Sequence, residues 1–195
     1  MALPVLGGVF TAQATPITLK FSPTGLGTMD GTYAYKWGIN WTVPTDNVIT
    51  AASLAYTDVK LTTYGINNPG ILWTNLLDTT SGSGTTGVTA YTDWDAGTDY
   101  WGSTGLVGKA LFPTLNVAQS FSYALDLAML KTYAGDGHFA MGIDPDCYYK
   151  DTSIVLSISY DQLLTPGGSQ VPDGGSTALL LGLALPLLRM FRRSK

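Results

Sequence analysis

Apolar and polar residues alternate along much of this chain, in short runs separated by turn residues. The clearest run covers residues 33–43, where every second side chain is aromatic or aliphatic: Tyr33, Tyr35, Trp37, Ile39, Trp41 and Val43. A period of two residues is typical of a β-strand, because successive side chains point to opposite faces. The pattern therefore predicts a strand with one buried, strongly aromatic face, closed by a turn at residues 44–47.

Further runs of the same kind follow at short intervals. They predict strands at residues 49–56, 58–63, 71–77, 88–91, 106–112, 121–125, 139–143 and 154–160. The first two of these runs are almost continuous, which indicates one strand interrupted by a bulge or bend. The Gly/Ser-rich segment at residues 81–84 is typical of a loop tip.

One segment departs from the period of two. Asp126 is suited to cap a short helix through about Ala134, with Leu127 and Leu130 along one side and Gly135 ending it. About eight strands, one short helix and abundant turns predict an all-β domain. We expect a two-sheet antiparallel sandwich, jelly-roll-like in type.

Composition supports this fold class and argues against nucleic-acid and zinc binding. Charged residues make up only 12% of the chain, and all 14 acidic residues are Asp, which favours turns over helix interiors. Between the two ends of the chain Asp outnumbers Lys, so no basic patch is available to meet nucleic-acid phosphates. Cys147 has no disulfide partner in the chain and is expected to be buried. One Cys and one His exclude a tetrahedral zinc site within one chain.

The C-terminal residues form a tripartite pattern. A short motif, Val171-Pro172-Asp173-Gly174-Gly175, precedes an apolar run at residues 178–188, and the chain closes with a basic cluster: Arg189, Arg192, Arg193 and Lys195. An apolar segment enters a bilayer, whereas the positive charges resist crossing it. The apolar run is shorter than the roughly 20 residues of a stable transmembrane helix. The alternative is an amphipathic or buried C-terminal helix.

This pattern resembles the PEP-CTERM sorting signal of Gram-negative bacteria, in its Val-Pro-Asp variant. The resemblance covers residues 171–195. It implies recognition by a membrane protease of the exosortase class, with Val171 to Gly175 as the sorting motif. It also implies a C-terminal hydrophobic helix lodged in the inner membrane, with the basic cluster on the cytoplasmic side. The precursor is then membrane-anchored, and the product reaches the cell surface or the extracellular matrix.

The N-terminal residues are also typical of export. An apolar segment at residues 2–10 leads into Thr11-Ala12-Gln13-Ala14, which has the small-residue pattern of a signal-peptidase site, so we expect cleavage after Ala14. No basic residue precedes the apolar segment, which suggests a true start further upstream. The alternative is an apolar first strand. The predicted domains are a signal peptide at 1–14, a β-sandwich at 15–165, a linker at 166–170 and the sorting signal at 171–195.

A second resemblance concerns the body. Residues 137–149, with the sequence Gly-His-Phe-Ala-Met-Gly-Ile-Asp-Pro-Asp-Cys-Tyr-Tyr, are similar to a segment of uncharacterised PEP-CTERM surface proteins. Their bodies look like the β-sandwiches of carbohydrate-binding modules. Tyr148 stands where those proteins are expected to carry a His, so no role for that His transfers to this chain.

Two groups of carboxylates are candidates for chemistry. Asp93, Asp95 and Asp99 lie in one long loop, where closely spaced carboxylates suit a hard cation such as Ca²⁺. The alternative for this loop is a solvated turn. Asp144 and Asp146 flank Pro145, so the pair could face one ligand or each could cap a tight turn. Apart from a structural calcium ion, no cofactor is expected.

Aromatic residues form the third candidate. Trp94, Tyr100 and Trp101 lie in the same polar loop as the first acidic group, where flat rings suit stacking on sugars. Other aromatics considered with them are Trp73, Tyr91, Tyr148 and Tyr149. Together with Asp144 and Asp146, the loop aromatics are the candidate glycan-binding residues.

These features leave two hypotheses for the body. The first is a non-enzymatic surface or matrix protein, structural or carbohydrate-binding, among exopolysaccharide. The second is a secreted carbohydrate-active hydrolase that uses an Asp pair, which requires two carboxyls about 5 to 10 Å apart on either side of a sugar.

Overall fold

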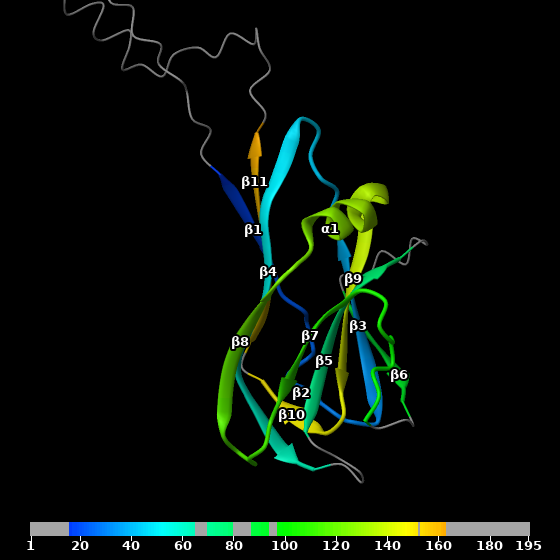
Figure 1. The fold of residues 1–195 in the computed structure, drawn as a ribbon, viewed down its shortest axis with the longest axis vertical. Coiled ribbons are helices and arrows are strands. Elements are labelled where there is room, and N and C mark those ends of the chain that lie inside the picture. The colour runs from blue at the N-terminus through cyan, green and yellow to red at the C-terminus, as the bar shows by residue number, and fades with distance from the viewer. Residues whose placement is uncertain (1–15, 65–69, 80–86, 94–96, 152, 163–195) are drawn as a thin grey trace, which may run out of the picture. The chain divides into compact units, whose positions relative to one another are not determined.

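The computed structural model describes residues 16–64, 70–79, 87–93, 97–151 and 153–162. These residues form two antiparallel β-sheets with one short α-helix, which confirms the predicted fold class (Figure 1). The predicted signal peptide, linker and C-terminal hydrophobic helix lie outside the described residues.

The first sheet is built around the longest strand of the chain. Its hydrogen-bonded order is β1-β11-β4-β10-β2, and β8 also pairs with β4. Its strands are β1 (Ile17–Phe21), β2 (Thr28–Met29), β4 (Asn47–Thr63), β8 (Ala118–Ala124), β10 (Tyr148–Lys150) and β11 (Ser153–Gln162). The strand next to β1 is therefore the last of the described strands, with Ile17 opposite Tyr160.

The second sheet has the order β6-β3-β9-β5-β7, with β9 at its centre. Its strands are β3 (Tyr33–Asn40), β5 (Ile71–Asp78), β6 (Val88–Thr92), β7 (Leu106–Leu111) and β9 (His138–Pro145). The aromatic strand predicted at residues 33–43 is β3, and it ends at Asn40. Trp37 and Ile39 are buried as expected, whereas Tyr33 at the start of the strand is 39% exposed.

The core lies between the two sheets and joins residues from both. From the first sheet come Leu54, Tyr56 and Leu156, and from the second Trp37 and Phe139, all at most 2% exposed. Burial of such large apolar side chains stabilises the fold by about 1.5–3 kcal/mol each. The buried Tyr56 hydroxyl lies 2.9 Å from Thr74 Oγ1, so its polar end has a partner across the sheets. Cys147 belongs to the same core, as the sequence predicted.

The interruption predicted between residues 56 and 58 is a β-bulge in β4. The register with β8 shifts between Tyr56 and Val59. Asp58 has φ 53°, in the left-handed region that non-glycine residues rarely adopt. Its backbone N–H donates to Ser120 Oγ at 3.0 Å, which holds the irregular residue to β8. One long strand therefore changes direction without ending.

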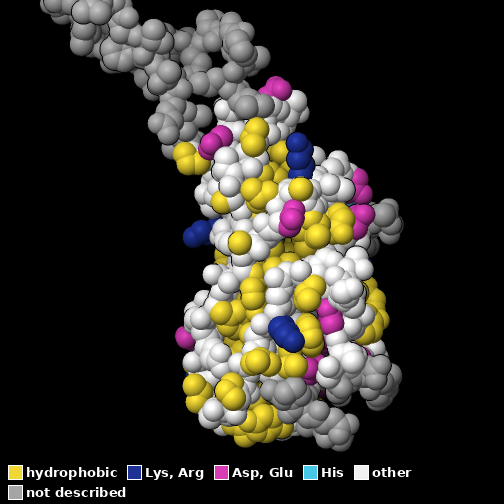
Figure 2. Space-filling model, in the orientation of Figure 1, with side chains coloured by type: hydrophobic (Ala, Val, Ile, Leu, Met, Phe, Trp, Pro, Cys, Tyr) yellow, Lys and Arg dark blue, Asp and Glu magenta, His cyan; other side chains and the backbone are white. Residues whose placement is uncertain are grey.

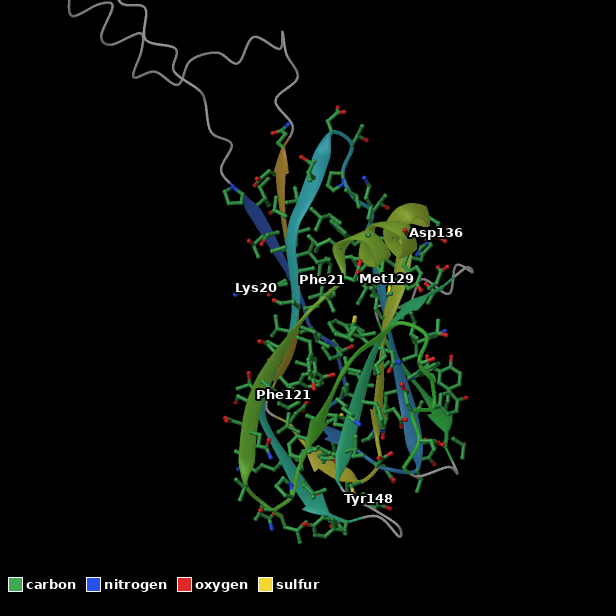
Figure 3. The ribbon with its side chains drawn as sticks, in the orientation of Figure 1. Lys20, Phe21, Phe121, Met129, Asp136 and Tyr148 are labelled. Carbon is green, nitrogen blue, oxygen red and sulfur yellow. The ribbon has the colours of Figure 1, made fainter. Side chains whose placement is uncertain are left out.

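The helix α1 (Leu127–Tyr133) packs against β4 and β5, one strand from each sheet. Asp126 caps it as predicted, accepting from the Met129 N–H at 2.9 Å. The predicted stop at Gly135 is wrong, because a 3₁₀ turn, η1 (Ala134–Asp136), follows and the left-handed residue is Gly137 at φ 93°. Figure 3 places Met129 on α1, well away from Tyr148 at the other end of the sandwich.

Candidate functional site

The candidate site lies on the outer face of the second sheet, opposite the core. The strand registers place four residue pairs side by side on this face: Ala34 with Tyr91, Trp73 with Asp144, Trp73 with Lys109, and Asn75 with Gly142. Side chains on one face of neighbouring strands contact each other directly. The face therefore combines aromatic rings, small residues and a carboxylate.

A loop crosses this face, and we call residues 97–105 the covering loop. The Tyr100 N–H donates to Asp144 Oδ2 at 2.7 Å, and the Gly97 N–H donates to Asp146 Oδ1 at 3.1 Å. Asn75 Nδ2 donates to Asp99 Oδ2 at 3.0 Å and to the carbonyl of Gly102 at 3.2 Å. The loop is thus fastened to β5 and to the end of β9 by polar side chains.

Two glycines allow the covering loop to approach the sheet. A Cβ on Gly142 of β9 would lie 2.7 Å from Trp101 Nε1, so the Trp101 indole occupies the space that a side chain would need. Gly105 has φ 70°, and a Cβ there would collide with the Leu76 carbonyl oxygen. The Leu76 N–H donates to the Gly105 carbonyl at 2.7 Å, which brings the two backbones together. Only glycine fits both positions.

The two carboxylates at the end of β9 are buried under this loop. Asp144 is 0% exposed and Asp146 is 2% exposed. Burial raises the pKa of Asp144 to about 8, and the negative charges of Asp93, Asp146 and Asp99 act in the same direction, against the Tyr100 N–H. Burial also raises the pKa of Asp146, opposed by the N–H groups of Gly97 and Trp73. The structure therefore joins the two acidic groups that the sequence presents separately.

The predicted cation loop is described only in part. Asp93 is 8% exposed just after the end of β6, and its N–H donates to the carbonyl of Thr32 at 2.8 Å. Asp99 accepts from the Trp101 N–H at 3.0 Å and from Asn75. Asp95 and Trp94 lie outside the described residues. Among the residues that are described, no three Asp, His or Cys side chains are gathered closely enough, as they stand, to hold a metal ion.

Three aromatic rings meet beside the carboxylates. Tyr91 and Tyr100 have ring centroids 6.2 Å apart with planes inclined by 31°, and Trp101 meets both rings edge to face at 5.6 and 4.8 Å. Tyr100 is 42% exposed, whereas the Trp101 Nε1 is buried. Lys36 Nζ lies 5.7 Å from the Tyr91 ring centroid, a cation–π distance. We call Tyr91, Tyr100 and Trp101 the aromatic platform.

The remaining predicted aromatics divide between two places. Trp73 lies on the same face of the second sheet, with Lys109 Nζ 4.8 Å from its ring centroid. Tyr149 is fully buried in β10 and packs against Phe112 at 5.0 Å, so it offers no binding surface. Tyr148 beside it is 36% exposed, but it belongs to the first sheet. Of these three, Trp73 alone joins the site.

Sequence reasoning missed Asn75 and Gly142. Asn75 is fully buried and holds both Asp99 and the loop backbone. A usable signal existed, because Asn75 stands in a run of otherwise apolar or small residues that is typical of a strand buried on both faces. A polar residue in such a strand needs a partner, which here comes from the covering loop.

On the face drawn in Figure 2, lysine side chains stand singly, and hydrophobic side chains lie between polar ones. Helices long and apolar enough to cross a membrane are not found within the described ranges. The sorting motif and the basic cluster at residues 189–195 lie outside those ranges.

Comparison with known proteins gives one match. Residues 170–195 match the VPDSG-CTERM motif. The five residues that give the motif its name are Val-Pro-Asp-Ser-Gly. The chain has four of them, Val171, Pro172, Asp173 and Gly175, and carries Gly174 in place of Ser. No curated protein matches the chain. The match supports an exported surface protein, sorted through a PEP-CTERM-type signal that implies processing by an exosortase from a membrane-anchored precursor.

Proposed function

We propose that the β-sandwich is a non-enzymatic glycan-binding module, displayed at the cell surface or in the exopolysaccharide matrix after sorting. Its binding surface is the aromatic platform on the second sheet. Exposed tyrosine rings provide flat apolar faces with a polar edge, which matches the alternation of C–H and hydroxyl groups around a sugar ring.

The observation that carries this proposal is the placement of Tyr100. Its ring is 42% exposed, yet its backbone N–H is held by the buried Asp144 at 2.7 Å. Trp101 packs against its edge at 4.8 Å. A ring held in position before binding loses little conformational entropy when a ligand arrives, and this favours affinity.

The burial of the Asp pair disfavours the hydrolase hypothesis. A glycosidase needs both carboxyls in contact with the sugar, one on each side of the scissile bond. Asp144 and Asp146 are at most 2% exposed, and each accepts a hydrogen bond from the covering loop. Two surface depressions, of about 200 and 290 Å³, lie elsewhere and contain at most one carboxylate each.

A glycan screen tests the binding proposal. The full chain, solubilised in a nonionic detergent, is applied to a glycan array with the variant Tyr100→Ala. The matched control is Tyr64→Ala, because Tyr64 is 43% exposed but lies just after the end of β4 in the first sheet. We expect Tyr100→Ala to weaken binding about tenfold, as one lost ring contact of about 1.4 kcal/mol would.

The control separates ring stacking from general adhesion. Equal binding by all three proteins would refute the platform as the binding surface. Release of reducing sugar by the wild-type chain, lost in Asp144→Asn, would replace the binding module with the hydrolase.

Sorting is tested separately. Replacement of Pro172 and Asp173 by Ala should leave an uncleaved, membrane-retained precursor, with the apolar segment in the inner membrane and the basic cluster on the cytoplasmic side. The matched control replaces Ser176 and Thr177 by Ala, which keeps the motif intact. Fractionation followed by mass spectrometry measures the product. Normal maturation of the Pro172/Asp173 variant would contradict exosortase sorting through this motif.

A further inference from the structure

The outer face of the second sheet continues beyond the aromatic platform as two rows of polar side chains. Lys36 on β3 stands opposite Thr89 on β6, two residues along that strand from Tyr91. Further along β3, Asn40 stands opposite His138 on β9. Lys36 and Asn40 are on the same face, because alternate residues of a strand point the same way. The two rows are about 13 Å apart along the strand, as the rise per residue requires.

A small recess lies between these rows. Gly38 occupies the middle position of β3 and has no side chain to fill it. The recess has a volume of about 10 Å³, which is room for one water-sized group. Ile39 and Phe139 border it as well, but they belong to the core. The polar residues that line the recess are Lys36, Asn40, Thr79, Thr89 and His138.

The polar groups at the recess are mainly hydrogen-bond donors. His138 Nδ1 lies 3.0 Å from Asn40 Oδ1, which occupies the amide oxygen and leaves the NH₂ group of Asn40 to donate. The Lys36 ammonium group only donates, and the threonine hydroxyls can donate. Among the described residues, those that line the recess include no carboxylate. The recess is therefore suited to an oxygen that carries negative charge.

Lys36 is positioned beside the aromatic platform before any ligand arrives. The residue is half-buried, and its Nζ lies 5.7 Å from the centroid of the Tyr91 ring. The carboxylates beside the platform are withdrawn from solvent, because Asp93, Asp144 and Asp146 are at most 8% exposed. The Lys36 ammonium group is thus a positive charge next to rings that suit a sugar.

We propose that the glycan bound by this module is acidic, and that a uronic-acid carboxylate binds between Lys36 and the recess while a neighbouring sugar ring stacks on the aromatic platform. The inference rests on the proposed glycan-binding function, and it adds the chemical class of the ligand and the residue that selects it. A carboxylate has two oxygens in one plane. One of them can enter the recess while the other accepts from the Lys36 ammonium group.

The overall charge of the body acts against this ligand, so the recess has to decide the selectivity. Residues 15–170 contain thirteen Asp and six Lys, and the long-range field of such a body repels an anion. At about 0.15 M salt the Debye length is about 8 Å, which screens distant charges but leaves a direct contact. Binding of an acidic glycan at this ionic strength must therefore come from short-range contacts such as the one to Lys36.

Paired glycans measure the effect of the carboxylate. The full chain in nonionic detergent is applied, at about 0.15 M salt, to an array of uronic-acid polysaccharides, each printed beside its carboxyl-reduced counterpart. Wild type is compared with Lys36→Met, in which an unbranched apolar side chain remains beside Tyr91 but the charge is lost. The matched control is Lys60→Met, which removes an exposed lysine from β4 in the first sheet. Tyr100→Ala reports on the aromatic platform.

We expect wild type to bind at least one acidic glycan about fivefold more tightly than its reduced counterpart. Lys36→Met should bind both members of that pair equally, and it should bind the reduced glycan as wild type does, which shows that it is folded. Lys60→Met should keep the preference.

Two results would overturn the acidic ligand. They are equal or weaker binding of the acidic member of every pair by wild type, and a preference that is unchanged in Lys36→Met. Binding of the reduced glycans that is lost in Tyr100→Ala would then still support the glycan-binding function. A chain that binds neither member of any pair also overturns the acidic ligand, and the broader glycan array decides the binding function by itself.

Discussion

The strands β9 and β11, each paired on both sides, belong to different sheets and are buried differently. Along β11, buried residues alternate with half-buried ones up to Tyr160, so one face packs in the core and the other meets solvent. Along β9 every residue after His138 is buried. The difference arises from the covering loop, which adds a layer over Gly142 and Asp144. An alternating apolar pattern locates the core face of a strand, but it does not reveal that the second face is also covered.

The largest expected effect comes from detaching this extra layer. Gly105→Ala should lower the free energy of unfolding by about 4 kcal/mol, because a Cβ there meets the Leu76 carbonyl and φ is positive. Gly102→Ala is a matched control, since Gly102 has φ 67° but open space around its Cβ position. It should cost only about 1 kcal/mol. Urea unfolding of both variants measures the difference, and equal costs would mean that the loop is not in tight contact with β5.

The next effect is a pH dependence of stability that arises from Asp144, on the outer face of the second sheet. The pKa of Asp144 is raised from 3.8 to about 8 in the folded chain, so the unfolded chain releases this proton first as pH increases. Stability should therefore fall between about pH 5 and about pH 8, by about 3 kcal/mol. Asp144→Asn should remove most of that slope. Urea midpoints at the two pH values measure it, and a wild-type slope that survives in Asp144→Asn would assign it to other groups.

A smaller effect compares equivalent positions on β9 and β11. Gly142→Ala should cost about 1–2 kcal/mol, because the new methyl group displaces the Trp101 indole, 2.7 Å from the Cβ position. Ser157→Ala on the half-buried face of β11 should change stability by less than about 0.5 kcal/mol. Trp fluorescence during unfolding follows both. Equal costs would show that the outer faces are equally open.

The smallest effect lies outside both outer faces. Asp126→Ala removes the N-cap of α1 and should cost about 1 kcal/mol. Because α1 packs against β4 and β5 at the inner side, this cost should be the same at about pH 5 and about pH 8. A cap cost that changed between these pH values would connect the helix to the covering loop.

Local patterns predicted most of the fold. The bulge at Asp58, the cap at Asp126 and the core face of β3 all follow from residues close together in the sequence. The strands β2 and β10 were missed because two or three residues are too few to show a period. β1 was missed as well, although its apolar residues Ile17, Leu19 and Phe21 alternate with the polar Thr18 and Lys20 and so carry the period of a strand.

The candidate site was predictable only in pieces. Asp93, Asp99, Asp144 and Asp146 were each identified, but their meeting depends on contacts such as Gly97 with Asp146, far apart in the sequence. Nothing within a short window specifies that a loop will cross a sheet. Gly142 and Asn75 are the residues in the strands that the crossing loop requires. However, a glycine in a strand is also typical of a bulge, and an Asn is also typical of a turn, so neither residue identifies the crossing.

The pairing of β1 with β11 determines when this domain can finish folding. Leu19 and Phe21 lie opposite Ile158 and Leu156, so the first described strand finds its neighbour only after nearly the whole body has been made. Contacts between such distant segments make folding slow, because a long chain must be closed before they form. If export delivers the chain from its N-terminus, β1 and one side of β4 stay unpaired until β11 emerges. The body would then reach its final topology only after residue 162 has left the export channel.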